Sequence, residues 1–297
     1  MSVGQQFTSL LTNAQLDRLA RLRIQSNRRF TNRARGEHFA GKGGMSTEFC
    51  DYRDYTDGDD TRFVDWNIFS RLHRPYLKIF HQEEETHVAI LVDASNSMLF
   101  EDKLNRAREL AAAFGVLGLR NGERVAVHSF RGNGEGSRLA PCRGTTSFPK
   151  LFSFIEGIEG GGDFPLEKGI EQMLRNHSGR GICLLLSDFL SGGDLSRAFS
   201  FLEGAGLEIF AMQILGPSEI DPGIQGDLRL VDSELEQTLD VSSAGDLLGY
   251  YQEYRAAFEE SLATHCRRRA GRFLSINAAE PLDSLLFDRL RRKGWIA

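Results

Sequence analysis

The chain has 297 residues, of which 41% are hydrophobic and 26% charged, and its formal net charge is −5 at pH 7. This composition supplies a sizeable core, in one large domain with additions or in two small ones. No apolar run is long enough to span a bilayer and residues 1–6 lack the features of a signal peptide, so we expect a cytoplasmic protein with no membrane span.

The first predicted element is an amphipathic helix over residues 10–30, with Asn13 as its N-cap. Its apolar stripe consists of Leu16, Leu19, Ala20 and Leu22. Residues 31–85 are richer in Gly, Asp and Arg, which predicts irregular structure with short strands. We expect residues 1–85 to form a helix and a segment packed on the core, and residues 86–297 to form the main domain.

From residue 86 onward, predicted strands and helices alternate. The predicted strands are 86–93, 124–130, 137–140, 181–187, 207–215 and 272–276. The predicted helices are 103–119, 147–158, 164–176, 195–203, 244–268 and 281–293. Residues 228–241 fit two short strands joined by a turn at Asp232-Ser233-Glu234. The alternation predicts an α/β fold with a doubly wound, mostly parallel sheet.

The predicted strand over residues 86–93 runs directly into an acid and two hydroxyls, at Asp93, Ser95 and Ser97. Its apolar residues show no polar alternation, as expected of a strand covered on both faces. A tight turn can aim one carboxylate and two hydroxyl oxygens inward, and Mg²⁺ or Mn²⁺ takes such donors together with waters. The pattern predicts a divalent-metal site, although Asp and Ser in such a turn also fit a helix cap.

A second predicted strand, over residues 181–187, also ends in an acid, in the pair Ser187-Asp188. In the strand order 3-2-1-4-5, the first and fourth strands flank the point where the order reverses. Ligands of doubly wound sheets sit outside the carboxyl ends of the strands at this point. We therefore expect Asp93 and Asp188 to be neighbours and to hold one cation together.

Residues 48–71 mix opposite charges with aromatic side chains. The charged residues include Arg53, Asp59, Asp60, Arg62, Asp65 and Arg71, and the aromatic ones include Tyr52, Tyr55 and Trp66. This composition predicts a buried or half-buried ion-pair network with aromatic cover, which fastens the segment onto the main domain. Catalysis by Asp59, Asp60 or Asp65 is the alternative, but no nucleophile and base pair stands beside them.

Charge is distributed unevenly along the chain. Residues 1–40 carry seven Arg against two acids, and residues 265–297 carry eight Lys and Arg against three acids. Each end therefore has a net charge of +5, which leaves −15 for the middle of the chain. Basic ends can bind nucleic acid, fold back on the acidic body or dock an acidic partner. The arginines near the N-terminus are not set among aromatic residues, so we expect no nucleic-acid binding.

Two parts of the sequence resemble known proteins. Asp93-Ala94-Ser95-Asn96-Ser97-Met98, with Ser187-Asp188 on a later strand, resembles the metal-ion-dependent adhesion site of von Willebrand factor type A domains. The block at residues 48–66, continued by Ser70-Arg71 and Leu77-Lys78-Ile79-Phe80, resembles the bacterial family catalogued as domain of unknown function fifty-eight. Members of that family join such a block to an A-type domain. The likeness extends from about Leu16 to Trp295 and implies a von Willebrand factor A-like fold.

The resemblance also implies which residues bind the metal. The implied ligands are Asp93, Ser95, Ser97 and Asp188. The A-type pattern further has a threonine in a loop before the fourth strand, where relatives usually have Gly-Gly-Thr-Asp. Here Gly162 stands at the threonine position and offers no hydroxyl, so Asp163 becomes a further candidate ligand, directly or through water.

These features together favour a non-catalytic, metal-dependent interaction module. An open coordination position on the ion can accept a carboxylate from a partner protein. The family resemblance implies an association with AAA+ ATPases of the MoxR type, in the remodelling or maturation of other proteins. The alternative is a metal-dependent hydrolase of phosphate esters, which a catalytic histidine or lysine beside Asp93 and Asp188 would favour.

Overall fold

The computed structural model describes residues 6–26, 31–32, 49–80, 82–83, 86–132, 136–163, 165–191, 193–223, 228–231, 238–241 and 244–297. The chain divides into two compact units. The main unit comprises Met1–Arg28 and Thr86–Ala297, and the signature unit comprises Arg29–Glu85. The first helix thus groups with the main unit, whereas the boundary predicted at residue 85 placed it with the signature segment. Packing of that segment on the core stays a prediction.

A six-stranded sheet in the order β12-β9-β8-β5-β6-β7 forms the centre of the main unit. Its strands are β5 (His87–Asp93), β6 (Arg124–Phe130), β7 (Gly136–Cys142), β8 (Gly181–Ser187), β9 (Leu207–Leu215) and β12 (Arg272–Asn277). All neighbours are parallel except the edge strand β7, which runs antiparallel to β6. This topology confirms the predicted α/β fold with a doubly wound, mostly parallel sheet.

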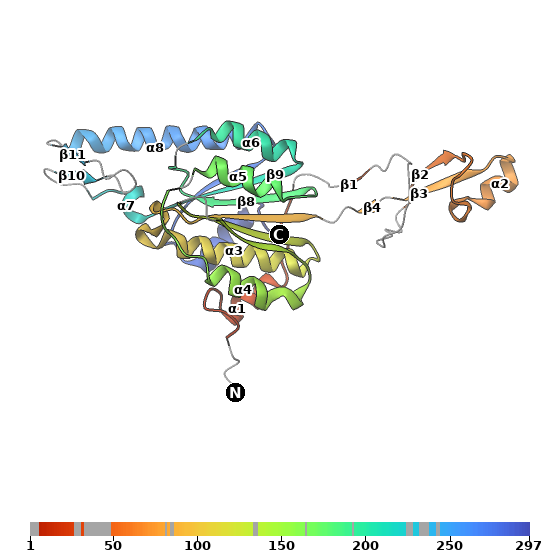
Figure 1. Ribbon diagram of the computed structural model, residues 1–297, viewed down its shortest axis with the longest axis horizontal. Helices are drawn as coiled ribbons and strands as arrows, with labels where there is room; N and C mark the ends of the chain where they lie inside the picture. The colour runs from red at the N-terminus through yellow and green to blue at the C-terminus, as the bar shows by residue number, and fades with distance from the viewer. Residues whose placement is uncertain are drawn as a thin grey trace. The chain divides into compact units, whose positions relative to one another are not determined.

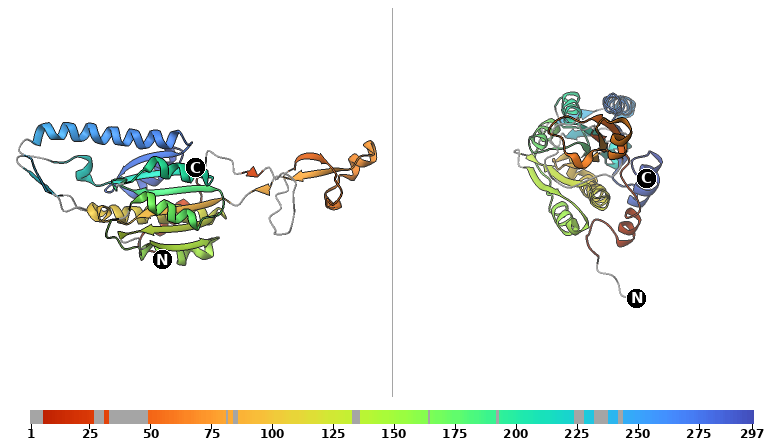
Figure 2. Two further views of the ribbon diagram at one scale, coloured as in Figure 1. Left: turned by 45° about the horizontal axis from the view of Figure 1, so that its top comes forward. Right: turned by 90° about the vertical axis from the view of Figure 1, so that its right-hand side faces the viewer.

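Helices cover both faces of this sheet (Figure 1). On one face lie α3 (Lys103–Arg120) and α4 (Phe148–Glu156). On the other lie α5 (Leu166–Arg175), α6 (Leu195–Gly204) and α8 (Ala244–Arg267). Figure 2 shows the same two helical layers from a second direction. Of the described helices, none is both long and apolar enough to cross a membrane.

Strand β5 shows why residues Val88 to Val92 are all apolar. Val88, Ile90 and Val92 pack into the core under α3, whereas Ala89 and Leu91 pack into the core under α5 and α6. Successive side chains of a strand point to opposite faces, so a strand covered on both faces has no position open to solvent.

The first helix is shorter than predicted. It is α1 (Asn13–Leu19), and its N-cap is Thr12, which forms a capping box with Gln15. The predicted N-cap at Asn13 and the predicted end at residue 30 are wrong. Past α1 the backbone pairs with the C-terminus instead: Arg23 N donates to Ala297 O at 2.9 Å, and Ala297 N donates to Arg23 O at 3.0 Å. A backbone engaged in these bridging bonds is not available for helical bonds.

The remaining elements of the main unit are short. They are η2 (Ser97–Asp102), η4 (Thr145–Ser147), α7 (Pro217–Ile220), β10 (Leu228–Val231), β11 (Thr238–Val241), α9 (Leu282–Ser284) and η5 (Leu285–Leu290). β10 and β11 pair antiparallel, as predicted, and the turn predicted at residues 232–234 lies outside the described residues. The predicted terminal helix forms as the short α9 followed by the π-helical η5.

Within its described residues, the signature unit contains two small antiparallel pairs and two short helical segments. Its elements are β1 (Thr31–Asn32), β2 (Phe49–Asp54), η1 (Thr61–Phe63), α2 (Trp66–Leu72), β3 (Tyr76–Phe80) and β4 (Gln82–Glu83). β2 pairs with β3, and β1 pairs with β4.

Among the described residues of the signature unit, the predicted ion-pair network does not form. The ion pairs there are separate: Arg53 with Asp59 at 2.5 Å, Arg62 with Asp60 at 2.6 Å, and Lys78 with Asp65 at 3.1 Å. Trp66, expected as aromatic cover, is 60% exposed. Local bonding is the physical reason that a network does not form. The carboxylate of Asp65 caps α2 by accepting hydrogen bonds from the backbone N–H groups of residues 67 and 68.

Candidate functional site

The two acids predicted to share a cation lie at the carboxyl ends of neighbouring parallel strands. Asp93 is the last residue of β5, and Asp188 directly follows β8, which pairs with β5. Strand β5 stands where the order of the sheet reverses, with β6 on one side and β8 on the other. Ligands of doubly wound sheets bind at this place.

Asp93 is buried, with 4% of its surface exposed. Its Oδ1 accepts a hydrogen bond from Ser95 N at 2.9 Å, and its Oδ2 accepts one from Ser187 Oγ at 2.5 Å. No ion pair joins it to a basic side chain in the part of the chain that the structure describes. Burial, followed by repulsion from the Asp188 carboxylate, raises the pKa of Asp93 to about 6. A cation beside Asp93 would relieve both effects.

Two hydroxyl groups accompany the Asp93 carboxylate. Ser95 and Ser97 are both buried, and their Oγ atoms lie 3.1 Å apart. Ser95 follows β5 closely, and Ser97 begins η2. The turn therefore brings one carboxylate and two hydroxyls together, as the spacing at every second residue predicts.

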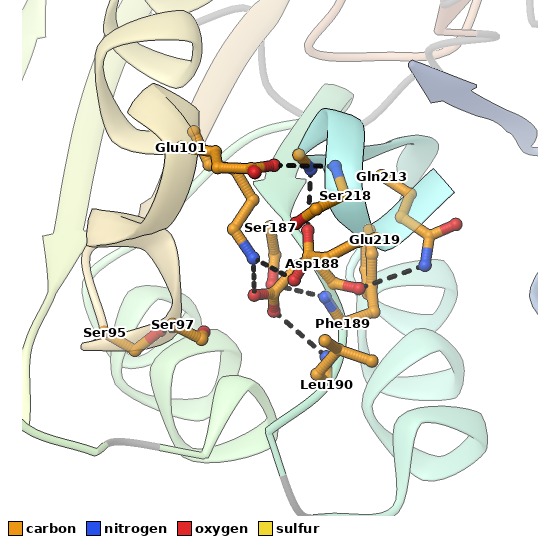
Figure 3. Close-up of polar contacts among 12 residues, drawn as sticks. Ser95, Ser97, Glu101, Ser187, Asp188, Phe189, Leu190, Gln213, Ser218 and Glu219 are labelled. Atoms are coloured by element: carbon orange, nitrogen blue, oxygen red, sulfur yellow. Dashed lines mark hydrogen bonds and ion pairs between the residues drawn. The ribbon is translucent and has the colours of Figure 1, made fainter. Parts of the chain in front are cut away.

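Asp188, by contrast, already has a cationic partner. Lys103, the first residue of α3, is fully buried, and its Nζ donates to Asp188 Oδ2 at 2.9 Å and to Glu219 Oε1 at 2.7 Å. The other carboxylate oxygen of Asp188 accepts from Leu190 N at 3.1 Å (Figure 3). Burial works to lower the pKa of Lys103, but the carboxylates of Asp188 and Glu219 outweigh it and raise the pKa. Lys103 is therefore an ammonium.

Sequence reasoning missed both Lys103 and Glu219. Lys103 opens a helix whose pattern is otherwise an apolar stripe, and Glu219 lies 116 positions further along the chain. No local signal joins them. The sequence does draw attention to Ser187, because it stands in the Ser-Asp pair that ends the fourth strand. Its hydrogen bond to Asp93 is seen only in the structure.

The glycine at the threonine position packs against another backbone. Gly162 has a φ of +72°, and a Cβ on it would lie 2.3 Å from the Cα of Gly132. The loop is also bonded to the turn after β5: Asn96 N donates to Gly162 O and Gly162 N donates to Asn96 Oδ1, both at 2.8 Å. The close approach explains why no threonine stands here.

Asp163, the fifth candidate ligand, lies in the same loop. It is exposed, and no described hydrogen bond or ion pair joins it to the other four candidates. Its participation in metal binding stays a prediction.

Three exposed apolar residues, Leu99, Phe100 and Leu190, stand close in sequence to these polar groups, and we call them the apolar rim. Their exposed fractions are 54%, 50% and 53%. Leu99 and Phe100 follow Ser97 in η2, and Leu190 follows Asp188 by two residues. The backbone nearby is unusual, since Glu101, Asp102 and Phe189 have φ values of +45°, +61° and +59°. Such conformations cost free energy in residues other than glycine and cluster at functional sites.

The donor set fits a hard divalent cation. In the described part of the chain, no three His, Cys, Asp or Glu side chains gather as a metal-binding group. An ion at Asp93 would therefore depend on the hydroxyls of Ser95 and Ser97 and on waters, which Mg²⁺ and Mn²⁺ accept. The buried Asp93 carboxylate, which has no ion pair among the described residues, is the observation that fits such an ion.

Comparison with known sequences gives a family match. The model of the family described as "Protein of unknown function DUF58" matches residues 51–268. The uncharacterized proteins Mb1516 of Mycobacterium bovis and Rv1480 of Mycobacterium tuberculosis are each 24% identical to this chain over 270 residues. Each match covers 88% of this chain and 85% of the relative.

Comparison with solved structures gives distant matches. BatB from Bacteroides thetaiotaomicron is 14% identical, with a TM-score of 0.44, and the match covers 70% of this chain and 98% of BatB. Proximal thread matrix protein 1 of the mussel byssus, with a zinc occupied MIDAS motif, is 18% identical, with a TM-score of 0.33 and coverage of 44% and 38%. Manganese-loaded TRAP protein of Plasmodium vivax is 11% identical, with a TM-score of 0.30 and coverage of 44% and 57%.

Proposed function

Because this chain belongs to the family described as protein of unknown function DUF58, whose description names no activity, we propose a function from the site itself. The protein is a non-catalytic interaction module that binds its partner through a divalent cation, Mg²⁺ or Mn²⁺. One observation carries the proposal: a buried carboxylate with two hydroxyls, and with no basic partner among the described residues, stands close in sequence to the exposed apolar rim.

The first step of the argument concerns the open coordination shell. Asp93, Ser95 and Ser97 offer three oxygen ligands, whereas Mg²⁺ prefers about six in octahedral geometry. Waters complete the shell until a partner carboxylate replaces one of them. The ion then joins two negatively charged groups that would otherwise repel each other.

The second step concerns the apolar rim. Full burial of an exposed leucine or phenylalanine side chain contributes about 1.5–3 kcal/mol. The three residues of the rim, each about half exposed, can therefore add affinity around the bridging carboxylate. Such an arrangement suits a protein surface that presents an acidic side chain among apolar ones.

The partner that we propose is an AAA+ ATPase of the MoxR type. The support is the family resemblance, which implies an association with such ATPases in the remodelling or maturation of other proteins. We propose that this partnership operates in the cytoplasm. The acidic character of the middle of the chain makes the ion more important for an approaching carboxylate.

A lysine does stand beside the two acids, as the hydrolase alternative requires, but its state argues against catalysis. Lys103 is fully buried, and its raised pKa keeps it protonated, so it cannot act as a general base. No described histidine contacts Asp93 or Asp188. The arrangement therefore favours binding over hydrolysis of phosphate esters.

Affinity measurements with the purified MoxR-type ATPase from the same host test the proposal. Wild-type protein in about 5 mM Mg²⁺ is compared with wild-type protein in excess chelator and with Asp93→Ala. Both changes should weaken binding at least about tenfold, because each removes the bridge between two carboxylates. Leu190→Ser should weaken it in part.

Two matched controls separate a local effect from a general one. Asp17→Ala removes an exposed acid of α1, and Tyr254→Ser removes an aromatic side chain that is 73% exposed on α8. Both should bind the ATPase as the wild type does. Binding that survives both chelator and Asp93→Ala contradicts the proposal. Mn²⁺-dependent turnover of a phosphate ester that Asp93→Ala abolishes would instead support the hydrolase.

A further inference from the structure

Lys103 places an ammonium group against Asp188, one of the candidate metal ligands. Its side chain is completely buried, as is that of Asp188, and its ammonium contacts Asp188 and Glu219 at 2.9 and 2.7 Å. A lysine is seldom fully buried unless it is paired, because removing an ammonium from water is costly. The pairing with two carboxylates explains how it is tolerated here.

The charges of this cluster do not balance. Asp93, Asp188 and Glu219 carry three negative charges when ionised, and Lys103 carries one positive charge. Two negative charges remain, and the carboxylate without an ion pair among the described residues is that of Asp93. One divalent cation next to Asp93 would neutralise the cluster.

We propose that Lys103 is an affinity-determining residue of the metal site, because its ammonium holds the Asp188 carboxylate for which a divalent ion at Asp93 must compete. The inference rests on the proposed function, since it takes the cation at Asp93, Ser95 and Ser97 as given. Lys103 weakens the site in two ways: it repels the ion, and it engages an oxygen of Asp188 that the ion would otherwise attract.

Glu219 keeps the ammonium in place from the other side. Its Oε2 accepts from Gly216 N at 2.6 Å, and its main-chain oxygen accepts from Tyr251 OH at 2.6 Å. These bonds fix the segment that begins α7 and tie it to α8. A neutral residue at position 219 would leave Lys103 with Asp188 as its remaining ion-pair partner and remove one negative charge from the cluster. Both changes disfavour a divalent ion.

Lys103 and Glu219 therefore change the metal affinity in opposite directions. Mn²⁺ binding measures both effects. Electron paramagnetic resonance of free Mn²⁺ gives the dissociation constant of the wild type, Lys103→Gln and Glu219→Gln. Lys103→Gln retains a hydrogen-bond donor toward Asp188 and should bind Mn²⁺ at least about tenfold more tightly. Glu219→Gln should bind it at least about threefold more weakly. Lys150→Gln, at an exposed position on α4, should match the wild type.

Each outcome supports or overturns the proposed role of Lys103. Equal or weaker Mn²⁺ binding by Lys103→Gln overturns the inference and leaves the proposed function standing, provided that Asp93→Ala still abolishes binding. Absence of Mn²⁺ binding in the wild type and in Lys103→Gln overturns both. If Lys103→Gln does not fold, Glu219→Gln decides alone, because affinity equal to or above that of the wild type contradicts the role of Lys103.

Discussion

Asp93 and Asp188 show that two residues of one type, buried at adjacent strand ends, can have different electrostatic surroundings. Asp188 faces the Lys103 ammonium, whereas Asp93 faces hydroxyl and amide donors alone among the described residues. Burial, followed by repulsion from the Asp188 carboxylate, raises the pKa of Asp93. At the residue scale, the sequence predicts which acids meet but does not predict which of them is already paired.

The first prediction concerns Gly162→Thr, which places a hydroxyl at the position where A-type relatives have one. The substitution should not improve metal binding, because a Cβ here would lie 2.3 Å from the Gly132 backbone and the φ of +72° disfavours threonine. It should destabilise the protein by about 2–4 kcal/mol. Urea unfolding measures the loss, and Gly161→Ala, which has open space but a φ of +148°, is the strain control. Tighter Mn²⁺ binding by Gly162→Thr at unchanged stability would show that the loop rearranges.

The contact of α3 with the sheet depends on small residues at the element scale. A Cβ on Gly115 would lie 2.7 Å from the side chain of Leu151 in α4, and one on Gly118 would lie 2.7 Å from Val125 in β6. The helix thus approaches both neighbours more closely than an alanine would allow. This packing also encloses Glu123, in the connection between α3 and β6, whose Oε2 has no hydrogen-bond partner among the described residues.

A pH-dependent stability follows from Glu123. Burial raises the pKa of Glu123 to about 7, above its ordinary value of 4.5. A raised carboxyl pKa contributes stability that is fully present below pH 4.5 and lost as the pH rises through 7. Glu123→Gln cannot ionise and should therefore gain, relative to wild type, on the order of 2 kcal/mol between pH 5 and pH 8. Urea unfolding at both pH values checks this, and a stability difference that stays constant with pH would contradict the assignment.

At the scale of the whole molecule, the basic ends of the sequence find acidic partners within the main unit. Arg269 pairs with Glu203 and Arg272 pairs with Glu208, both at 3.7 Å. These two arginines of the C-terminal end therefore fold back on the body, which is one of the possibilities that the charge distribution leaves open. Arg18 of α1 pairs instead with Asp283 of the C-terminal end at 3.5 Å, and this exposed pair adds little stability.

The two tryptophans of the chain report on the two units separately. Trp66 lies in the signature unit, and Trp295 is buried in the main unit. Asp65 caps α2, accepts from Tyr52 OH at 3.1 Å and pairs with Lys78, and all of these partners belong to the signature unit. Asp65→Ala should therefore lower the melting midpoint seen by Trp66 by about 4–8 °C, as expected for a lost cap in a small domain.

Single-tryptophan variants make this measurement possible. Trp295→Phe leaves the fluorescence of Trp66, and Trp66→Phe leaves that of Trp295. Asp65→Asn is the matched control, because asparagine also caps helices, and it should retain most of the midpoint. An equal shift of the Trp295 transition in Asp65→Ala would show that the two units unfold together, against the local role assigned to Asp65.

The sequence by itself determined the alternation of strands and helices, the bounds of β6, β8 and β9, and the meeting of Asp93 with Ser187-Asp188 at one edge of the sheet. These follow from periodicity and from the rule that parallel strands end on the same side. Only the tertiary structure decided the early end of α1, the exposure of Trp66, and the pairing of Lys103 with Asp188 and Glu219. Each of these depends on contacts between residues far apart in the chain, or on competition between donors for one carboxylate. A local sequence pattern shows neither kind of dependence.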